Sequence, residues 1–171
     1  MISAERNIVL IGMPGVGKST VGVLLAKATS RNFLDTDVWI QSREGRTLQE
    51  ILEREGSEAF CAREERHVLA LDCRAHVIAT GGSVVYGERA MEHLRRVGIV
   101  VHLDLELALL RERLRNLAVR GVVIAVDQTL EQLWEEREPL YRRWADVAIA
   151  VGDLNQDQVV ARVLQELRGI G

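Results

Sequence analysis

Short apolar runs alternate with amphipathic segments along most of the chain. Five runs predict buried strands, over residues 7–11, 32–35, 76–80, 98–103 and 146–151. Between them, apolar residues recur at the spacing of one helix face, as Val21, Leu24, Leu25 and Ala28 do in the segment after the first strand. The pattern predicts helices over 18–29, 37–44, 47–54, 57–72, 87–96, 105–114, 129–142 and 157–168.

Strands that alternate with helices are typical of an α/β fold, in which helices cover both faces of a parallel sheet. We therefore expect three layers, α/β/α, around a five-stranded parallel sheet, with right-handed crossovers. Ligands should bind at the carboxyl ends of the strands. The chain has two prolines, no low-complexity linker and no internal repeat, which favours one domain over residues 1–171.

Composition narrows the class of protein further. The chain has 171 residues, 47% of them hydrophobic, and a formal net charge of −3, so it lacks the excess of Lys and Arg that nucleic-acid binders carry. Two cysteines, Cys61 and Cys73, do not make a disulfide framework. No apolar run reaches the roughly 18 residues of a membrane span, and the start does not resemble a signal peptide. We expect a cytoplasmic monomer without nucleic-acid or membrane partners.

A phosphate-binding loop joins the first strand to the first helix. Residues 12–19, GMPGVGKS, match the pattern G-x-x-x-x-G-K-[ST] in full, between an apolar strand and an amphipathic helix. The glycines let backbone N–H groups approach phosphate oxygens, and the helix N-terminus adds partial positive charge. Lys18 is expected to reach the β- and γ-phosphates, and the Ser19 hydroxyl to ligate Mg²⁺. The alternative is a structural glycine turn whose serine caps the helix, but such a turn would not need a lysine at position 18.

The sequence favours a transferase over other users of nucleotides. It has no guanine-reading N-K-x-D, no D-x-x-G after a strand, and no signature segment of an ABC-type ATPase. Transfer to a small molecule needs an acceptor pocket and a lid that excludes water. An alternative of another class is a nucleotide-binding regulatory module with little transfer activity.

Acids and arginines in particular places are the candidates for the remaining chemistry. Asp35 and Asp37 stand two residues apart at the end of a strand, so one acid can support Mg²⁺ and the other can orient or deprotonate an acceptor hydroxyl. Asp37 could instead cap the next helix. The arginines lie in a helix and the loop after it, where they form either a solvated face or groups that close over a phosphoryl group; they are Arg111, Arg113, Arg115 and Arg120.

At this point the chain resembles the shikimate kinase family, which has the nucleoside-monophosphate-kinase-like P-loop fold. The resemblance runs nearly end to end, and the collinear order of its segments carries it. Beyond the phosphate loop these are FLDTD (33–37), GRTLQEILEREGSEAF (45–60), REE (63–65), VIATGG (77–82), EREPLY (136–141) and ADV (145–147).

The resemblance implies roles for individual residues, with ATP and Mg²⁺ as cofactors. Lys18, Asp37 and Arg120 would be catalytic, and Asp37 would be the candidate general base. Ser19 and Asp35 would serve the metal. The nucleotide would contact Gly12, Gly15, Val16, Gly17, Lys18, Ser19, Thr20 and Arg113. The acceptor would contact Asp37, Phe60, Cys61, Gly81, Gly82 and Arg137. A substrate-binding helical segment would span about 36–62, and a mobile lid about 113–126.

The departures from the family pattern concern mainly the acceptor. Phe60-Cys61 stands where the family has F-R, with an arginine that grips the substrate carboxylate, and Ser83 replaces a third glycine. The lid reads RGVV from Arg120 where the family has R-P-L-L, and residues 152–156 lack an arginine and a proline often found there.

Two kinds of acceptor remain open from these departures. Losing one charge-assisted contact costs about 1.5–3 kcal/mol, which weakens shikimate binding without abolishing it if Arg137 remains. Glu64, which would neighbour the missing arginine, would instead suit an acceptor with an amine, such as homoserine. The first expectation is phosphorylation of shikimate to shikimate 3-phosphate. The four histidines show no metal-ligand spacing, so no further metal is expected.

Overall fold

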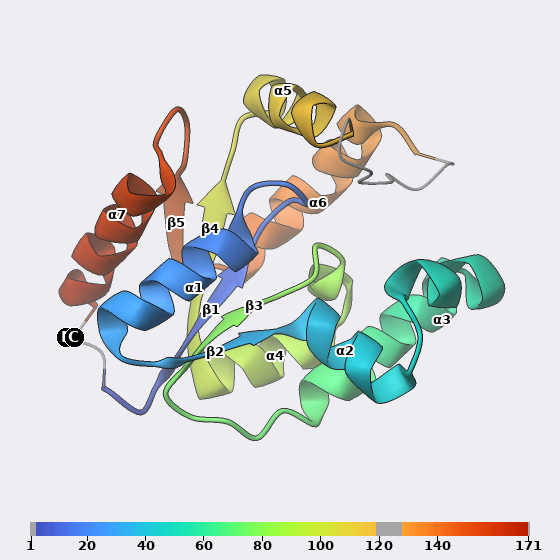
Figure 1. The fold of residues 1–171 in the computed structure, drawn as a ribbon, viewed down its shortest axis with the longest axis horizontal. Coiled ribbons are helices and arrows are strands. Elements are labelled where there is room, and N and C mark those ends of the chain that lie inside the picture. Colours follow the sequence, from blue (N-terminus) through green and yellow to red (C-terminus); the bar gives the residue numbers. More distant parts are fainter. Residues whose placement is uncertain (1–2, 119–127, 171) are drawn as a thin grey trace.

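The computed structural model describes residues 3–118 and 128–170, and five parallel strands form its central sheet. Their order is β2-β3-β1-β4-β5, so β1 lies at the centre of the sheet (Figure 1). Val9 of β1 pairs with Ile78 of β3 on one side and with Val100 of β4 on the other. The strands are β1 Asn7–Ile11, β2 Asn32–Asp35, β3 His76–Ala79, β4 Gly98–Asp104 and β5 Val147–Ala150. The five predicted strands are thus confirmed, with ends that differ by one residue at most.

The helices follow the prediction with small shifts at their ends. A short 3₁₀ helix, η1 Val84–Tyr86, was not predicted, and the helices predicted over 47–54 and 57–72 form one long helix with a break. The break is at Gly56, whose φ of 83° and ψ of 172° are not helical. The helices are α1 Lys18–Thr29, α2 Thr36–Glu44, α3 Leu48–Leu69, α4 Glu88–Val97, α5 Leu107–Ala118, α6 Leu130–Trp144 and α7 Gln156–Gly169.

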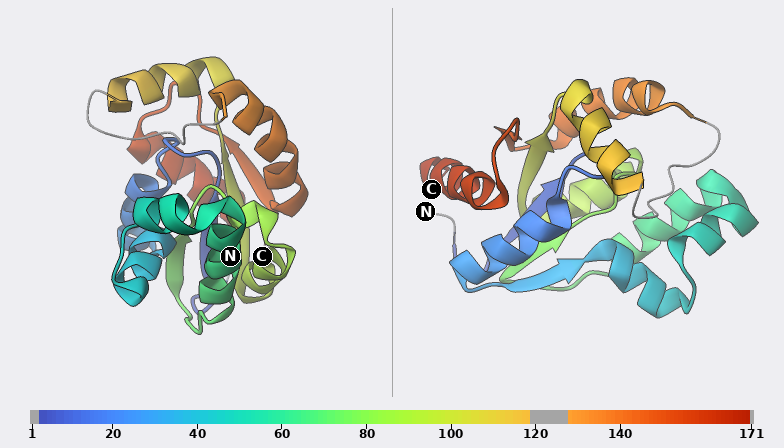
Figure 2. Two further views of the ribbon diagram at one scale, coloured as in Figure 1. Left: turned by 90° about the vertical axis from the view of Figure 1, so that its right-hand side faces the viewer. Right: turned by 45° about the horizontal axis from the view of Figure 1, so that its top comes forward.

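Helices cover both faces of the sheet, as the alternating pattern predicts. α1 and α7 pack together on one face, while α4 and α6 pack on the other (Figures 1 and 2). Every residue of β1 is buried, because this central strand has neighbours on both edges and helices on both faces. The core therefore fixes the carboxyl end of β1, from which the phosphate loop departs.

α2 and α3 extend beyond the β2 edge of the sheet (Figure 1). Arg63 joins the parts of this helical segment, because its guanidinium lies 2.8 Å from Glu44 Oε2 and 2.6 Å from Glu55 Oε2. Glu55 precedes the break at Gly56 and Arg63 follows it, while Glu44 belongs to α2. These ion pairs hold the second half of α3, which carries Cys61 and Glu64, in a defined orientation toward the sheet.

Across residues 3–118 and 128–170, no helix combines the length and the apolar character needed to cross a membrane.

Candidate active site

The phosphate loop has a backbone that only glycines adopt readily. Gly12, Gly15 and Gly17 have φ values of 144°, 82° and 102°, all in the left-handed half of conformational space. Lys18 begins α1 and is 8% exposed, and its Nζ donates hydrogen bonds to the carbonyl oxygens of Gly12 at 2.8 Å and Met13 at 3.0 Å. Burial lowers the pKa of Lys18 to about 8. The loop thus curls around a buried cation.

Gly12→Ala is expected to lower the free energy of unfolding by about 2–4 kcal/mol. A Cβ atom at this position would lie 2.7 Å from the carbonyl oxygen of Leu103, at a φ that strains any L side chain. Gly152→Ala is the matched control, because Gly152 also has a positive φ but nothing within 4 Å of an added Cβ. Urea unfolding measures both variants, and equal losses would contradict the steric explanation.

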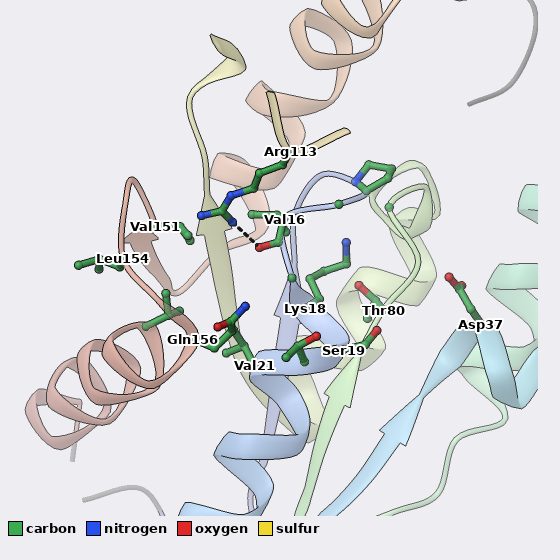
Figure 3. A pocket seen from close by; sticks show the side chains of 16 residues that line it. Val16, Lys18, Ser19, Val21, Asp37, Thr80, Arg113, Val151, Leu154 and Gln156 are labelled. Carbon is green, nitrogen blue, oxygen red and sulfur yellow. Dashed lines mark hydrogen bonds between the residues drawn. The ribbon is translucent and has the colours of Figure 1, made fainter. Parts of the chain in front are cut away.

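A cavity of about 770 Å³ lies over the loop at the carboxyl ends of the strands. Figure 3 shows Lys18 and Ser19 at its floor, Asp37 on one side, and Val151, Leu154 and Gln156 on the opposite side. Arg113 reaches over it from α5. This cavity lies where the sequence predicts the ligand site, at the carboxyl ends of the strands.

Arg113 ties α5 to the loop. Its guanidinium donates to the carbonyl oxygens of Val16 at 3.3 Å and Gly152 at 3.1 Å. The neighbouring arginines point elsewhere, since Arg111 pairs with Glu131 and Arg115 is exposed. Of the four arginines, Arg113 is the one that the described structure brings to the cavity. Arg120 and residues 119–126 of the predicted lid lie outside the described residues.

The two acids after β2 have different surroundings. Asp35 is the N-cap of α2, because its Oδ1 accepts from the backbone N–H groups of Asp37 at 2.9 Å and Val38 at 3.3 Å. Its Oδ2 accepts from the Ser19 hydroxyl at 2.6 Å. The capping role considered for Asp37 thus belongs to Asp35, while Asp37 sits in the first turn and lines the cavity. Burial, with the charge of Asp35, raises the pKa of Asp37.

A second cavity, of about 500 Å³, adjoins the first at Pro14. Phe60, Cys61 and Arg137, three of the predicted acceptor residues, line it. Arg137 is held in place by Tyr86, whose hydroxyl accepts from Nε at 3.1 Å and whose ring centroid lies 5.1 Å below the guanidinium carbon. Arg137 therefore stands between the phosphate loop and this second cavity, the predicted acceptor cavity.

Gly81 and Gly82 bring the chain close to charged side chains. A Cβ atom on Gly81 would lie 2.7 Å from Asp37 Oδ1, and one on Gly82 would lie 2.9 Å from Arg137 Nη1. The Gly82 carbonyl oxygen accepts from the Tyr141 hydroxyl at 2.6 Å. These two glycines thus let Asp37 and Arg137 approach the same stretch of backbone.

Sequence reasoning missed two side-chain clusters, because their members are far apart in the chain. Ser83 donates to the buried Glu64 at 2.6 Å, across the wall of the acceptor cavity. Below the phosphate loop, ligand atoms of His102, Asp104 and Glu138 lie within 4.8 Å of one another. Arg142 pairs with both of these carboxylates, at 3.8 Å and 2.6 Å, and so offsets one of their two negative charges.

The comparisons with known proteins agree with this geometry. The family model described as shikimate kinase matches residues 14–168. The chain belongs to the shikimate kinase family. Among its relatives, shikimate kinase 2 of Enterobacter sp. (strain 638) is 38% identical, with 95% of this chain and 96% of the relative covered. A shikimate kinase of Dechloromonas aromatica (strain RCB) is 37% identical over 96% of this chain and 92% of the relative.

Solved shikimate kinases share the fold. A shikimate kinase from Acinetobacter baumannii in complex with shikimate matches with a TM-score of 0.85 and 32% identity, covering 96% of this chain and 94% of that one. A shikimate kinase from Aquifex aeolicus matches with a TM-score of 0.79 and 30% identity, covering 95% and 96%. The predicted family and fold are confirmed, and the family's chemistry is ATP-dependent transfer of a phosphoryl group to a hydroxyl.

Proposed function

We propose that this shikimate kinase family member transfers the γ-phosphoryl group of ATP to a hydroxyl of shikimate, giving shikimate 3-phosphate. The observation that carries the proposal is the position of Asp37, which lines the nucleotide cavity and faces Gly81 beside the acceptor cavity. Asp37 lies between the phosphate loop and Arg137, which would bind the carboxylate of the substrate. This arrangement suits a hydroxy acid whose hydroxyl must meet the γ-phosphate.

At the nucleotide end, the loop and Lys18 hold the phosphates. Lys18 exchanges the carbonyl oxygens of Gly12 and Met13 for phosphate oxygens, and so neutralises charge on the transferred group. The backbone of residues 12–20 surrounds the phosphates, and Arg113 covers them from α5. Arg120 stays the proposed lid arginine, which would approach the γ-phosphate when the lid closes.

Ser19 and Asp35 fit Mg²⁺. Their side-chain oxygens lie 2.6 Å apart, Ser19 lines the cavity, and Mg²⁺ favours one or two protein oxygens together with water and phosphate. When bound, the ion would neutralise charge between the β- and γ-phosphates. Ser19 would ligate it directly, while Asp35 would orient its water shell and continue to cap α2.

Asp37 and Arg137 act on the acceptor. Asp37 accepts the hydrogen bond of the attacking hydroxyl and takes or orients its proton, helped by a raised pKa that makes it a better base. Arg137 pairs with the acceptor carboxylate, since its guanidinium is already oriented by Tyr86. Phe60 and Cys61 line the same cavity, and Gly81 and Gly82 would offer backbone contacts beside it.

Arg113→Ala is expected to raise the KM for ATP about 10-fold, because it removes one charge-assisted contact at the nucleotide cavity. The KM for shikimate should stay unchanged, since Arg113 does not line the acceptor cavity. Steady-state kinetics with each substrate varied separately measures both values. Arg115→Ala, the exposed neighbour on the same helix, is the control and should behave as the parent.

Shikimate and homoserine, compared at equal concentration in a coupled ADP-release assay with Mg-ATP, test the choice of acceptor. The proposal predicts robust turnover on shikimate. Turnover on homoserine alone would favour an amine-bearing acceptor, which Cys61 beside an unpaired Glu64 would suit. Tight ATP binding without turnover on either acceptor would support a regulatory nucleotide-binding module instead.

A further inference from the structure

The carboxyl group of Glu64 lies buried behind the acceptor cavity, and the proposed function leaves it without a role. Glu64 is 2% exposed, and its Oε2 accepts from the Ser83 hydroxyl at 2.6 Å. Its Oε1 is buried and has no hydrogen-bond partner in the described ranges, where no arginine or lysine lies within ion-pair distance of it. An ionised carboxylate is costly in such a place.

Glu64 is separated from the acceptor cavity only by the cavity wall. Cys61, one turn earlier on α3, and Ser83, its hydrogen-bond donor, both line the cavity. A Cβ atom on Gly81 would lie 2.5 Å from Glu64 Oε1 and 2.7 Å from Asp37 Oδ1. Two carboxyl groups thus crowd the same glycine, at the point where a substrate would bridge Asp37 and Arg137.

The groups that face Glu64 come from its own helix, from three other helices and from the loop after β3. Burial raises its pKa most strongly and Asp37 of α2 raises it further, whereas Ser83, Arg137 of α6 and Lys18 of α1 lower it, for a value of about 7. The remaining neighbours, the Cys61 thiol and the Tyr141 hydroxyl, have raised pKa values and stay neutral near pH 7. The carboxyl group therefore changes its charge within the working range of an enzyme.

We propose that Glu64 determines the affinity of the acceptor site for an anionic substrate: the site binds a carboxylate when Glu64 carries a proton and loses affinity when Glu64 ionises. This inference rests on the proposed function. Because Ser83 donates to Oε2, the proton resides on Oε1, the atom that lies against Gly81. When Glu64 ionises, a second negative charge lies beside Asp37. Arg137 then has to offset the charges of both carboxylates as well as the charge of the substrate. Glu64 acts through this charge and is a positioning residue.

The test is the KM for shikimate as a function of pH, at saturating Mg-ATP, in the parent enzyme and in Glu64→Gln. In the parent, KM should rise about 25-fold between pH ~6.5 and ~8.5, the result for one ionisation at a pKa of about 7 when only the protonated form binds the substrate. In Glu64→Gln it should stay nearly flat, because glutamine keeps the shape and the acceptor oxygen for Ser83. The titrations of Asp37 and Lys18 should change kcat instead of KM, in the parent and in Glu64→Gln alike.

Two further variants keep the inference falsifiable. Glu65→Gln, on the adjacent residue that pairs with Arg89 at the surface, should keep the pH profile of the parent. Ser83→Ala should move the KM transition to higher pH, because it removes a hydrogen bond that lowers the pKa of Glu64. If Glu64→Gln does not fold, the shift of the KM transition in Ser83→Ala decides whether the inference holds. If the parent and all variants turn over shikimate with the same pH dependence of KM, the inference about Glu64 is wrong and the proposed function stands. If the parent shows no turnover of shikimate at any pH, the inference and the proposed function are both wrong.

Discussion

Lys18→Met is expected to lower kcat for phosphoryl transfer by about 10³-fold, the largest effect of any single substitution in the loop. Lys18 is the buried cation around which the phosphate loop curls, and its Nζ lies under the carbonyl oxygens of Gly12 and Met13. Charge grows on the phosphoryl oxygens in the transition state, so loss of this ammonium group lowers kcat more than it weakens ATP binding.

Lys18→Met should not unfold the protein. Burial lowers the pKa of Lys18 to about 8, below its unfolded value of 10.5, so the ionised form opposes folding at neutral pH and methionine removes that cost. Lys27→Met, in the last turn of the same helix, is the matched control and should keep full activity. Single-turnover kinetics, with Tm recorded alongside, measures the effect. A loss of less than tenfold would contradict the role of Lys18.

Asp37→Asn is expected to lower kcat by about 10²–10⁴-fold, because asparagine cannot accept the proton of the attacking hydroxyl. The KM for shikimate should change less, since the amide still forms a hydrogen bond to that hydroxyl. In the parent enzyme kcat should fall as Asp37 becomes protonated, at a pH above the ordinary range of aspartate, since burial and Asp35 raise its pKa. Steady-state kinetics over pH measures both effects.

Asp72→Asn is the control for the loss of a carboxylate, because Asp72 is exposed in the loop before β3. It should leave kcat unchanged. If Asp37→Asn retains full turnover, the base assignment is wrong, and Asp37 only helps to orient the acceptor.

Local patterns in the sequence predicted the fold, and they named several of the residues that line the cavity over the phosphate loop. Runs such as residues 7–11 are apolar without interruption because both faces of the sheet are covered, and this makes buried strands easy to recognise. The spacing of Gly12, Gly15 and Gly17 encodes three left-handed residues, and the loop follows from them. Asp35 and Asp37 became candidates for a similar reason, because they are neighbours at the end of one strand.

The acceptor half depended on contacts that sequence spacing does not reveal. Ser83 and Glu64 are 19 positions apart, on the loop after β3 and on α3, and only the packing of α3 brings them together. His102 and Glu138 meet in the same way across β4 and α6. The break at Gly56 was read as the boundary between two helices, because a positive φ in one glycine does not show whether the chain resumes the same helix.

The most direct test of the central claim follows the γ-phosphate itself. The protein is incubated with Mg-ATP labelled in its γ-phosphate and with shikimate, and the products are separated. We expect the label to move to shikimate 3-phosphate and little inorganic phosphate to form without acceptor. Label that appears only as inorganic phosphate, or that stays in ATP with shikimate present, would show that the proposed function is wrong.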